Sequence, residues 1–174
     1  KYVLILHDDD YLNDNFFENF IDINKKLKEF NYILWNGRAC NNNNEEVWRG
    51  NVLQLYNYPD KNFGTGIKNS QALLNNYMNG NGFVISPVIQ IFETKKSLHI
   101  LQWCELNYKY PENYSRPKMM LGNEIALTYY NLKYSDNFYF YNEYYTTYIQ
   151  SETSETFING QKLLKGYNNA RALL

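Results

Sequence analysis

Residues 1–10 have the sequence KYVLILHDDD, and this stretch decides the fold class of the chain. Residues 1–6 form an apolar run of the length typical of a fully buried strand, so we expect a central strand of a sheet. The carboxylates of Asp8, Asp9 and Asp10 repel one another and cannot be buried without a counter-charge. They should therefore lie in a crevice at the carboxyl end of that strand.

The next segment has the periodicity of an amphipathic helix. Apolar residues recur at steps of three and four positions over residues 15–30, and Asn13 or Asp14 is suited to be the N-cap. The apolar positions of this helix are Phe16, Phe20, Ile23, Leu27 and Phe30. A strand, an acidic turn and a helix make half of a βαβ unit, so the sequence predicts an α/β fold.

The rest of the chain predicts alternating short elements within one domain, residues 1–174, because no linker or internal repeat interrupts it. Asn36-Gly37 is a turn signal between two short strands, and residues 50–70 have no regular pattern. We expect strands at 32–35, 38–40, 83–87, 138–141 and 144–149, and helices at 71–78, within 88–103, at 123–133 and weakly at 161–174.

Composition excludes several classes of protein. With 174 residues, 44% hydrophobic and 18% aromatic, the chain can bury a core. The net charge of -1 offers no field for nucleic acid. Cys40 and Cys104 have no metal-binding spacing, which favours free buried thiols in the reducing cytoplasm. No apolar run approaches the ~20 residues of a membrane span.

The acidic turn is suited to a hard divalent cation. Carboxylates of alternating residues can converge in a tight turn, and Mg²⁺ and Mn²⁺ prefer such oxygen ligands, often bridging them to substrate phosphates. Two alternative roles stay open for Asp8, Asp9 and Asp10. The acids could interact with the dipole of the next helix, or they could form the centre of a metal-dependent phosphohydrolase.

Four segments, in order along the chain, resemble the GT-A glycosyltransferases, in particular family 2. The first, residues 1–12, resembles the strand and DxD motif of that family. Residues 79–86 resemble the small-residue strand beneath the sugar and acceptor, and residues 121–127 resemble the Gly-Glu-Asp helix start. Residues 138–148, followed by 151–156, resemble the closing strand pair and its Ser-containing loop.

The resemblance implies a fold and an activity. The fold is the GT-A mixed sheet flanked by helices, of which the N-terminal nucleotide-binding half would precede Lys1. The activity is that of an inverting hexosyltransferase, which moves a sugar from a nucleotide-diphosphate sugar, a UDP-sugar first, to a hydroxyl of a saccharide or lipid-linked saccharide. The cellular role common in the family is synthesis of surface polysaccharide in the cytoplasm, with peripheral association at the inner face of the membrane.

The resemblance also implies roles for single residues. Asp8 and Asp10 would hold Mn²⁺ or Mg²⁺ against the donor diphosphate, with Asp9 contributing to the cofactor site, and Glu124 would be the general base. Glu124 and His7 could also have purely structural roles. Glu124 could be an ordinary acid in the first turn of a helix, and His7 could be a packed or capping residue.

The sequence departs from the family pattern at two places. Asn123 stands where the family has the first of two acids, and Gln150 or Ser151 stands where relatives often have a His. These departures favour a second interpretation, a non-catalytic carbohydrate-binding or scaffold module with the same fold. For most aromatic residues we expect core packing, although Trp35, Trp48 and Trp103, with the Tyr-rich run 138–148, could stack on sugars. Of the three tryptophans, Trp48 should be the exposed one.

Overall fold

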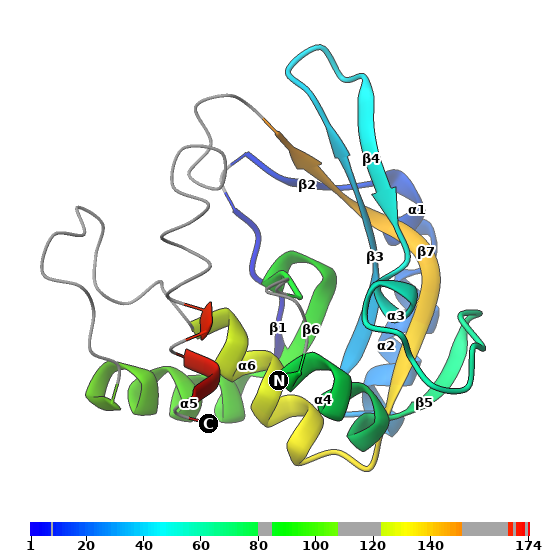
Figure 1. Cartoon of the computed structure of the whole chain (residues 1–174). Helices are drawn as coiled ribbons and strands as arrows, with labels where there is room; N and C mark the ends of the chain where they lie inside the picture. The colour runs from blue at the N-terminus through cyan, green and yellow to red at the C-terminus, as the bar shows by residue number, and fades with distance from the viewer. Residues whose placement is uncertain (8, 80–84, 108–122, 151–166, 169, 173) are drawn as a thin grey trace, which may run out of the picture.

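The computed structural model of the protein describes residues 1–7, 9–79, 85–107, 123–150, 167–168, 170–172 and 174. Asp8, Ser151 and the first two residues of the expected strand 83–87 lie outside the described residues. The rest of that expected strand is wrong, because residues 85 and 86 have no regular structure and Pro87 begins a 3₁₀ helix. The elements, in chain order, are β1 (Tyr2–Val3), β2 (Tyr11–Leu12), α1 (Asp14–Glu18), α2 (Phe20–Glu29), β3 (Ile33–Cys40), β4 (Glu46–Gly50), α3 (Val52–Leu55), β5 (Gly66–Asn69), α4 (Ser70–Met78), the 3₁₀ helix η1 (Pro87–Ile89), β6 (Gln90–Glu93), α5 (Thr94–Asn107), α6 (Asn123–Lys133) and β7 (Asn137–Ile149) (Figure 1).

The strands form one curled, mixed sheet, as expected for an α/β fold. Its path is β1-β6-β3-β7-β2, with β4 paired to β3 and β5 paired to β7. The long strands β3 and β7 are parallel, and every other pair is antiparallel. This pairing brings the start of the chain, through β2, to the C-terminal end of β7, where the acidic turn is held.

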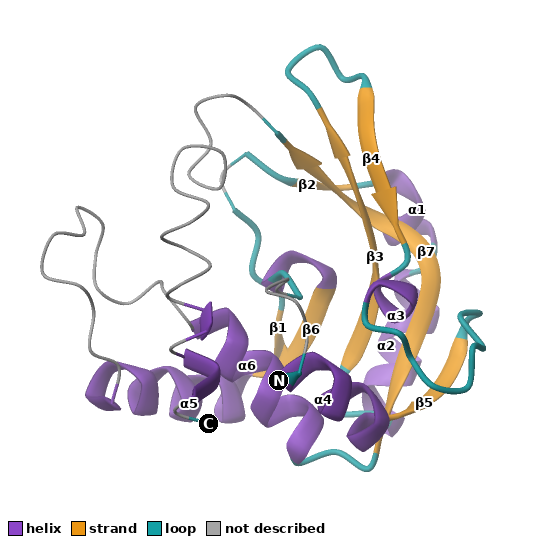
Figure 2. Cartoon of the chain, viewed as in Figure 1, coloured by secondary structure: helices purple, strands orange, loops and turns teal. Residues whose placement is uncertain are grey.

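Helices cover both faces of the sheet. Phe16 of α1 packs against Trp35 of β3 and Tyr145 of β7, with ring centroids 5.7 and 5.8 Å apart. Asp22 of α2 accepts a hydrogen bond of 2.7 Å from the Tyr141 hydroxyl. Figure 2 shows α4, α5 and α6 grouped together, whereas α1 and α2 lie behind β7 in this view. The two helix layers close the core on β3 and β7, whose inward residues are almost fully buried.

The predicted helices are largely confirmed, with two differences in the first of them. The segment 15–30 is two helices, α1 and α2, which meet at Asn19. Phe20 is exposed, because the break at Asn19 turns it away from the face that buries Ile23 and Leu27. Asn13 is the N-cap residue, but its side chain bonds to β7 instead of the helix: its Nδ2 donates to Tyr144 O at 2.7 Å.

The expected central strand 1–6 is wrong. Only Tyr2 and Val3 pair, with β6, and they lie at one end of the sheet path. Tyr2 and Leu6 are exposed. An apolar run shows that a segment can be buried, but the number of pairing partners is decided by distant segments, and among the described residues β1 has a single one.

The turn expected at Asn36-Gly37 is also wrong, since β3 runs through it without interruption. The register with β7 shifts at this point: Trp35 faces Tyr141, whereas Asn36 faces Tyr144. The extra residues of β7 bulge out here. Four short strands are not expected from the sequence at all, namely β2, β4, β5 and β6, and the helix expected within 88–103 begins only at Thr94.

Candidate functional site

The acidic turn is fixed to the end of β7 by its own backbone and by Asp10. The Asp10 backbone N–H donates to His7 O at 3.3 Å, which closes the turn. The Ile149 backbone N–H donates to Asp10 Oδ1 at 3.2 Å. Immediately after the turn, β2 pairs with β7 in the register Tyr11 to Thr147. The turn therefore lies where β2 begins and β7 ends, and it does not directly follow β1.

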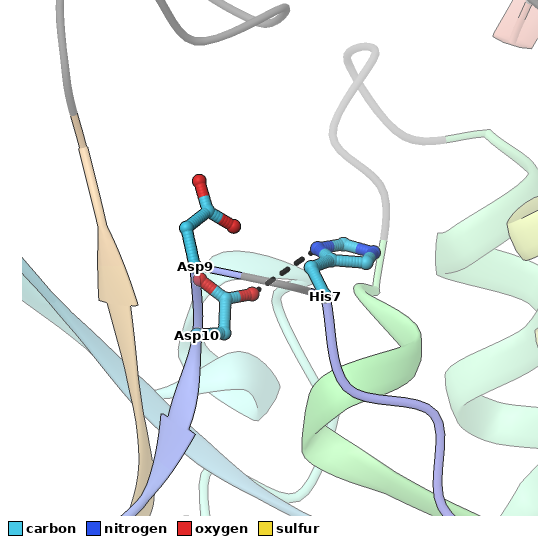
Figure 3. A group of neighbouring side chains, drawn as sticks. All are labelled: His7, Asp9 and Asp10. Atoms are coloured by element: carbon cyan, nitrogen blue, oxygen red, sulfur yellow. Dashed lines mark ion pairs between the residues drawn. The ribbon is translucent and has the colours of Figure 1, made fainter.

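His7 and Asp10 face each other across the turn (Figure 3). His7 Nδ1 lies 3.1 Å from Asp10 Oδ2, and the Asp10 side chain is only 4% exposed. The hydrogen bond to Asp10 raises the pKa of the His7 imidazole, and the negative charges of Asp10, Glu124 and Asp9 raise it further, although burial acts in the opposite direction. When it is protonated, His7 offsets the cost of burying the Asp10 carboxylate.

Three side chains of the turn could hold a metal ion together. One ligand atom each from His7, Asp9 and Asp10 lies within 4.8 Å of the other two. Two ligands on an ion bound at about 2.1 Å are at most about 4.2 Å apart, so a small rotation of the exposed Asp9 would complete the set. Asp8, the other expected ligand, lies outside the described residues, and His7 takes part in the cluster that the structure does describe.

Glu124, at the start of α6, is near enough to His7 for the two charges to influence each other. Burial raises the pKa of its carboxyl, whereas a hydrogen bond from Tyr167 and the charge of His7 lower it. The influence is mutual, because Glu124 in turn raises the pKa of His7. The fold therefore brings Asp9, Asp10 and Glu124, which the sequence predicts as site residues, to one place. The raised pKa means that Glu124 holds a proton more readily than an exposed glutamate does.

The departures from the family pattern lie beside these residues. Asn123 Oδ1 is buried, and no hydrogen-bond donor reaches it from the described part of the chain. Gln150 is exposed, and its backbone N–H donates to Cys40 O at 2.8 Å, so its backbone ends the pairing of β3 with β7. An amide at position 123 leaves Glu124 as the one carboxylate of the expected pair.

Sequence reasoning did not single out Tyr148 or Ser86. Burial raises the pKa of the Tyr148 hydroxyl, and the charges of Asp10 and Glu124 raise it further. This hydroxyl is hydrogen-bonded to the Ser86 side chain. Its ring covers Gly37, where a Cβ atom would overlap it. The pairing of β3 with β7 places Tyr148 over Gly37, and no local pattern signals it.

The three tryptophans have different environments. Trp35 is fully buried, and its Nε1 donates to Thr146 Oγ1 at 2.9 Å, so it belongs to the core. Trp103 is half-buried and packs edge-on against Tyr130. Trp48 is 41% exposed, which confirms the expectation from the sequence. Cys40 and Cys104 are both buried, also as expected.

Comparison with protein-family models, with curated proteins and with solved structures gives no match. The resemblance to family 2 glycosyltransferases therefore depends on the quoted motifs alone. Within the described residues, no helix has both the length and the apolar character needed to cross a membrane.

Proposed function

We propose that this chain belongs to a metal-dependent glycosyltransferase of the GT-A type, which transfers a sugar from a nucleotide-diphosphate sugar to an acceptor hydroxyl. The observation that supports the proposal is the convergence of two acidic groups from distant parts of the chain. The turn of His7, Asp9 and Asp10 lies near the half-buried Glu124 at the start of α6. Such a transferase needs one group for the donor diphosphate and a separate base for the acceptor.

His7, Asp9 and Asp10 would hold the ion, with Asp8 as a further ligand by resemblance. A bound Mn²⁺ or Mg²⁺ neutralises the charge that develops on the nucleotide leaving group. Because the set contains an imidazole nitrogen beside carboxylates, Mn²⁺ suits it better than Mg²⁺. Asp10 is held by Ile149, so its carboxylate is in place before any ligand arrives.

Glu124 would take the proton of the acceptor hydroxyl. A base needs a pKa raised toward the working pH, and burial raises that of Glu124. The hydrogen bond from Tyr167 fixes the carboxylate and restrains the pKa from rising further. His7 carries a positive charge nearby when protonated, which stabilises the charged form of Glu124 between turnovers.

The test compares Glu124→Gln with a matched surface variant, Glu105→Gln, on the exposed part of α5. We expect Glu124→Gln to lower sugar transfer by roughly a hundredfold or more, since a positioned base contributes about 10²–10⁴. Both variants should bind Mn²⁺ and UDP as the wild type does. Calorimetry and the anomalous signal of Mn²⁺ in crystals would measure this binding. Transfer at the wild-type rate by Glu124→Gln would refute the role of Glu124 as base.

A second function, a non-catalytic carbohydrate-binding module, is favoured by one observation. Asn123 replaces an acid of the family pattern, and its oxygen is buried with no donor in the described part of the chain. This alternative predicts sugar binding without Mn²⁺ and no anomalous peak at His7 and Asp10. A Mn²⁺ peak at these residues in crystals soaked with UDP would exclude it.

A further inference from the structure

Three large apolar side chains are exposed next to one another on α1 and α2. Phe17 is 62% exposed, Phe20 is 51% exposed and Ile21 is 72% exposed. The two phenylalanine rings pack against the buried Phe16, with ring centroids 5.5 and 6.2 Å away from it. Single exposed apolar residues are ordinary on a protein surface, whereas a cluster of them marks a surface that binds a partner.

Charged residues extend this cluster along both helices. The Asn19 backbone N–H donates to Asn15 O at 3.2 Å, and the Ile23 backbone N–H donates to Asn19 O at 3.0 Å. Helical hydrogen bonds are therefore present on both sides of the junction. Residues at steps of three and four positions share one side of a helix. One such series, all of it exposed, is named here the α1–α2 stripe and consists of Asp14, Glu18, Ile21, Lys25 and Lys28.

The stripe points away from the sheet. The apolar residues Ile23 and Leu27 of α2 are buried, and they are not part of the stripe. Asp22 is hydrogen-bonded to the Tyr141 hydroxyl of β7, so its charge is directed toward the sheet as well. Figure 1 shows α1 and α2 on the outer side of β7. The stripe is therefore available to a partner molecule.

The charges of the stripe are separated by sign. Its N-terminal end carries the acids Asp14 and Glu18, its C-terminal end carries the bases Lys25 and Lys28, and Ile21 lies between them. Asp14 is seven positions before Ile21, and Lys28 is seven positions after it. None of the ion pairs formed among the described residues involves any of these four charged side chains. Their charges are thus open to a partner.

We infer that the α1–α2 stripe binds the same stripe of a second copy of this chain, with the two stripes antiparallel and a two-fold axis at Ile21. Rotation about this axis brings Asp14 of each copy to Lys28 of the other, and Glu18 of each copy to Lys25 of the other. A two-fold interface uses one patch twice, so the patch must be complementary to itself. The order of charges in the stripe meets this condition.

An anionic membrane fits the same surface less well. Exposed apolar residues together with lysines on a helix are also typical of proteins that bind lipid headgroups. However, Asp14 and Glu18 belong to the same stripe, and anionic headgroups would repel them. Lys26, the remaining lysine of α2, is already 3.3 Å from Glu29. A surface with acids at one end and bases at the other favours a second copy.

The interface is small, so the dimer should be weak. From the first to the last residue, the stripe is about 21 Å long at 1.5 Å per residue. Exposed ion pairs contribute little affinity and chiefly fix the orientation of the partners. Most of the affinity should come from burying Phe17, Phe20 and Ile21. We expect a dissociation constant of roughly 10–500 µM.

The test is sedimentation equilibrium of the full chain from about 10 µM to about 1 mM, without metal or nucleotide. The wild type should shift from monomer to dimer over this range. Ile21→Ser should raise the dissociation constant at least tenfold, because it removes an apolar contact at the centre of the interface. Its unfolding temperature should stay as in the wild type, since Ile21 is exposed in the monomer. A wild type that is monomeric at the highest concentration would overturn the inference.

Charge reversal at one end of the stripe tests the antiparallel pairing itself. A variant with Asp14→Lys and Glu18→Lys has only bases on its stripe, and a variant with Lys25→Glu and Lys28→Glu has only acids. Each should be monomeric alone, because like charges would meet. An equimolar mixture of the two should form a heterodimer. If both variants have the circular dichroism of the wild type and their mixture stays monomeric, the inference is wrong.

Lys1→Glu combined with Lys95→Glu is the matched control. Both lysines are exposed and lie outside the stripe, and the net charge changes as it does in Lys25→Glu with Lys28→Glu. This control should dimerise as the wild type does, and a monomeric control would overturn the inference. Vesicles of phosphatidylcholine and phosphatidylserine in equal parts test the alternative. Binding of a monomeric wild type to them would show that the partner of the stripe is lipid. Every outcome is independent of the transferase proposal.

Discussion

At the scale of single residues, Asp10 combines two roles that are usually separate. Its Oδ1 accepts a backbone hydrogen bond from Ile149, and its Oδ2 pairs with His7. The first contact joins the turn to β7, whereas the second places a carboxylate oxygen beside an imidazole nitrogen. Only the second needs a negative charge, because the amide oxygen of an asparagine can accept the Ile149 hydrogen bond equally well.

Asp10→Asn should therefore separate metal binding from folding. We expect the affinity for Mn²⁺, measured by calorimetry or electron paramagnetic resonance, to fall by roughly ten- to a hundredfold, while the unfolding temperature changes little. Glu18→Gln removes an exposed acid of α1 and should leave the affinity as it is. An affinity for Mn²⁺ that is unchanged in Asp10→Asn would show that the turn is not the metal site.

The candidate site could be predicted from the sequence only as far as local patterns reach. Asp9 and Asp10 are visible as a run of acids, and Glu124 is visible through a motif at a helix start. The proximity of Glu124 to His7 is set by how α6 packs, and the position of Tyr148 is set by the pairing of β7 with β3. Neither has a sequence signal, since both depend on residues more than a hundred positions apart.

At the scale of elements, β3 shows how tertiary contacts override a turn signal. Asn36-Gly37 is typical of a hairpin turn, yet here Asn36 is fully buried within a strand. Its Oδ1 accepts from the Val52 backbone N–H at 2.9 Å, and its Nδ2 donates to Asn142 Oδ1 at 2.9 Å. The side chain thus connects β3 to α3 and to the bulge of β7, which supplies the partners that a turn would otherwise provide.

Asn36→Ala should destabilise the protein by about 1–3 kcal/mol, because it leaves the buried Val52 N–H without an acceptor. Urea denaturation would show this as a lower midpoint with an unchanged slope. Asn24→Ala, at an exposed position of α2, should change stability by less than about 0.5 kcal/mol. Equal stability of the two variants would mean that the Val52 N–H is satisfied by water.

The strands that the sequence did not predict are short and partly polar. In β6, Gln90 is fully buried because it accepts from the Tyr32 hydroxyl at 2.5 Å and donates to Ile85 O at 2.7 Å. In β4, Glu46 and Arg49 form an exposed ion pair. Because β4 and β6 have only four or five residues with such side chains, their sequences show no clear alternation of apolar and polar residues that would predict a strand. The long, periodic α2 and α6 could be predicted, since their own residues determine them.

At the scale of the whole molecule, seven tyrosines belong to the buried core of the described residues, in a chain with 18 of them. Tyr145 packs between Phe16, Trp35 and Tyr141, with ring centroids between 5.5 and 6.0 Å apart. Hydroxyls inside the core lie close to one another, which disfavours a negative charge on any of them. Burial, the largest influence, raises the pKa of Tyr32, Tyr56, Tyr77, Tyr141 and Tyr148.

This core should make the protein sensitive to alkali. Burial raises the pKa of Tyr145 to about 12, with the charges of Glu143 and Asp22 adding to the effect. Below pH of about 10, tyrosines are neutral in both the folded and the unfolded chain, so their contribution to stability is complete. Above that pH the unfolded chain loses protons that the folded chain keeps. The free energy of unfolding should therefore fall from about pH 10 to 12.

Urea midpoints measured across this range, together with tyrosinate absorbance, would check the prediction. Tyr145→Phe should make the decline shallower by at most one proton, because one group that differs between the two states is gone. Tyr134→Phe, at an exposed side chain, should leave the slope as in the wild type. If Tyr145→Phe has the wild-type slope, the Tyr145 hydroxyl reaches water in the folded state, and the loss of stability belongs to other buried tyrosines such as Tyr32 and Tyr77.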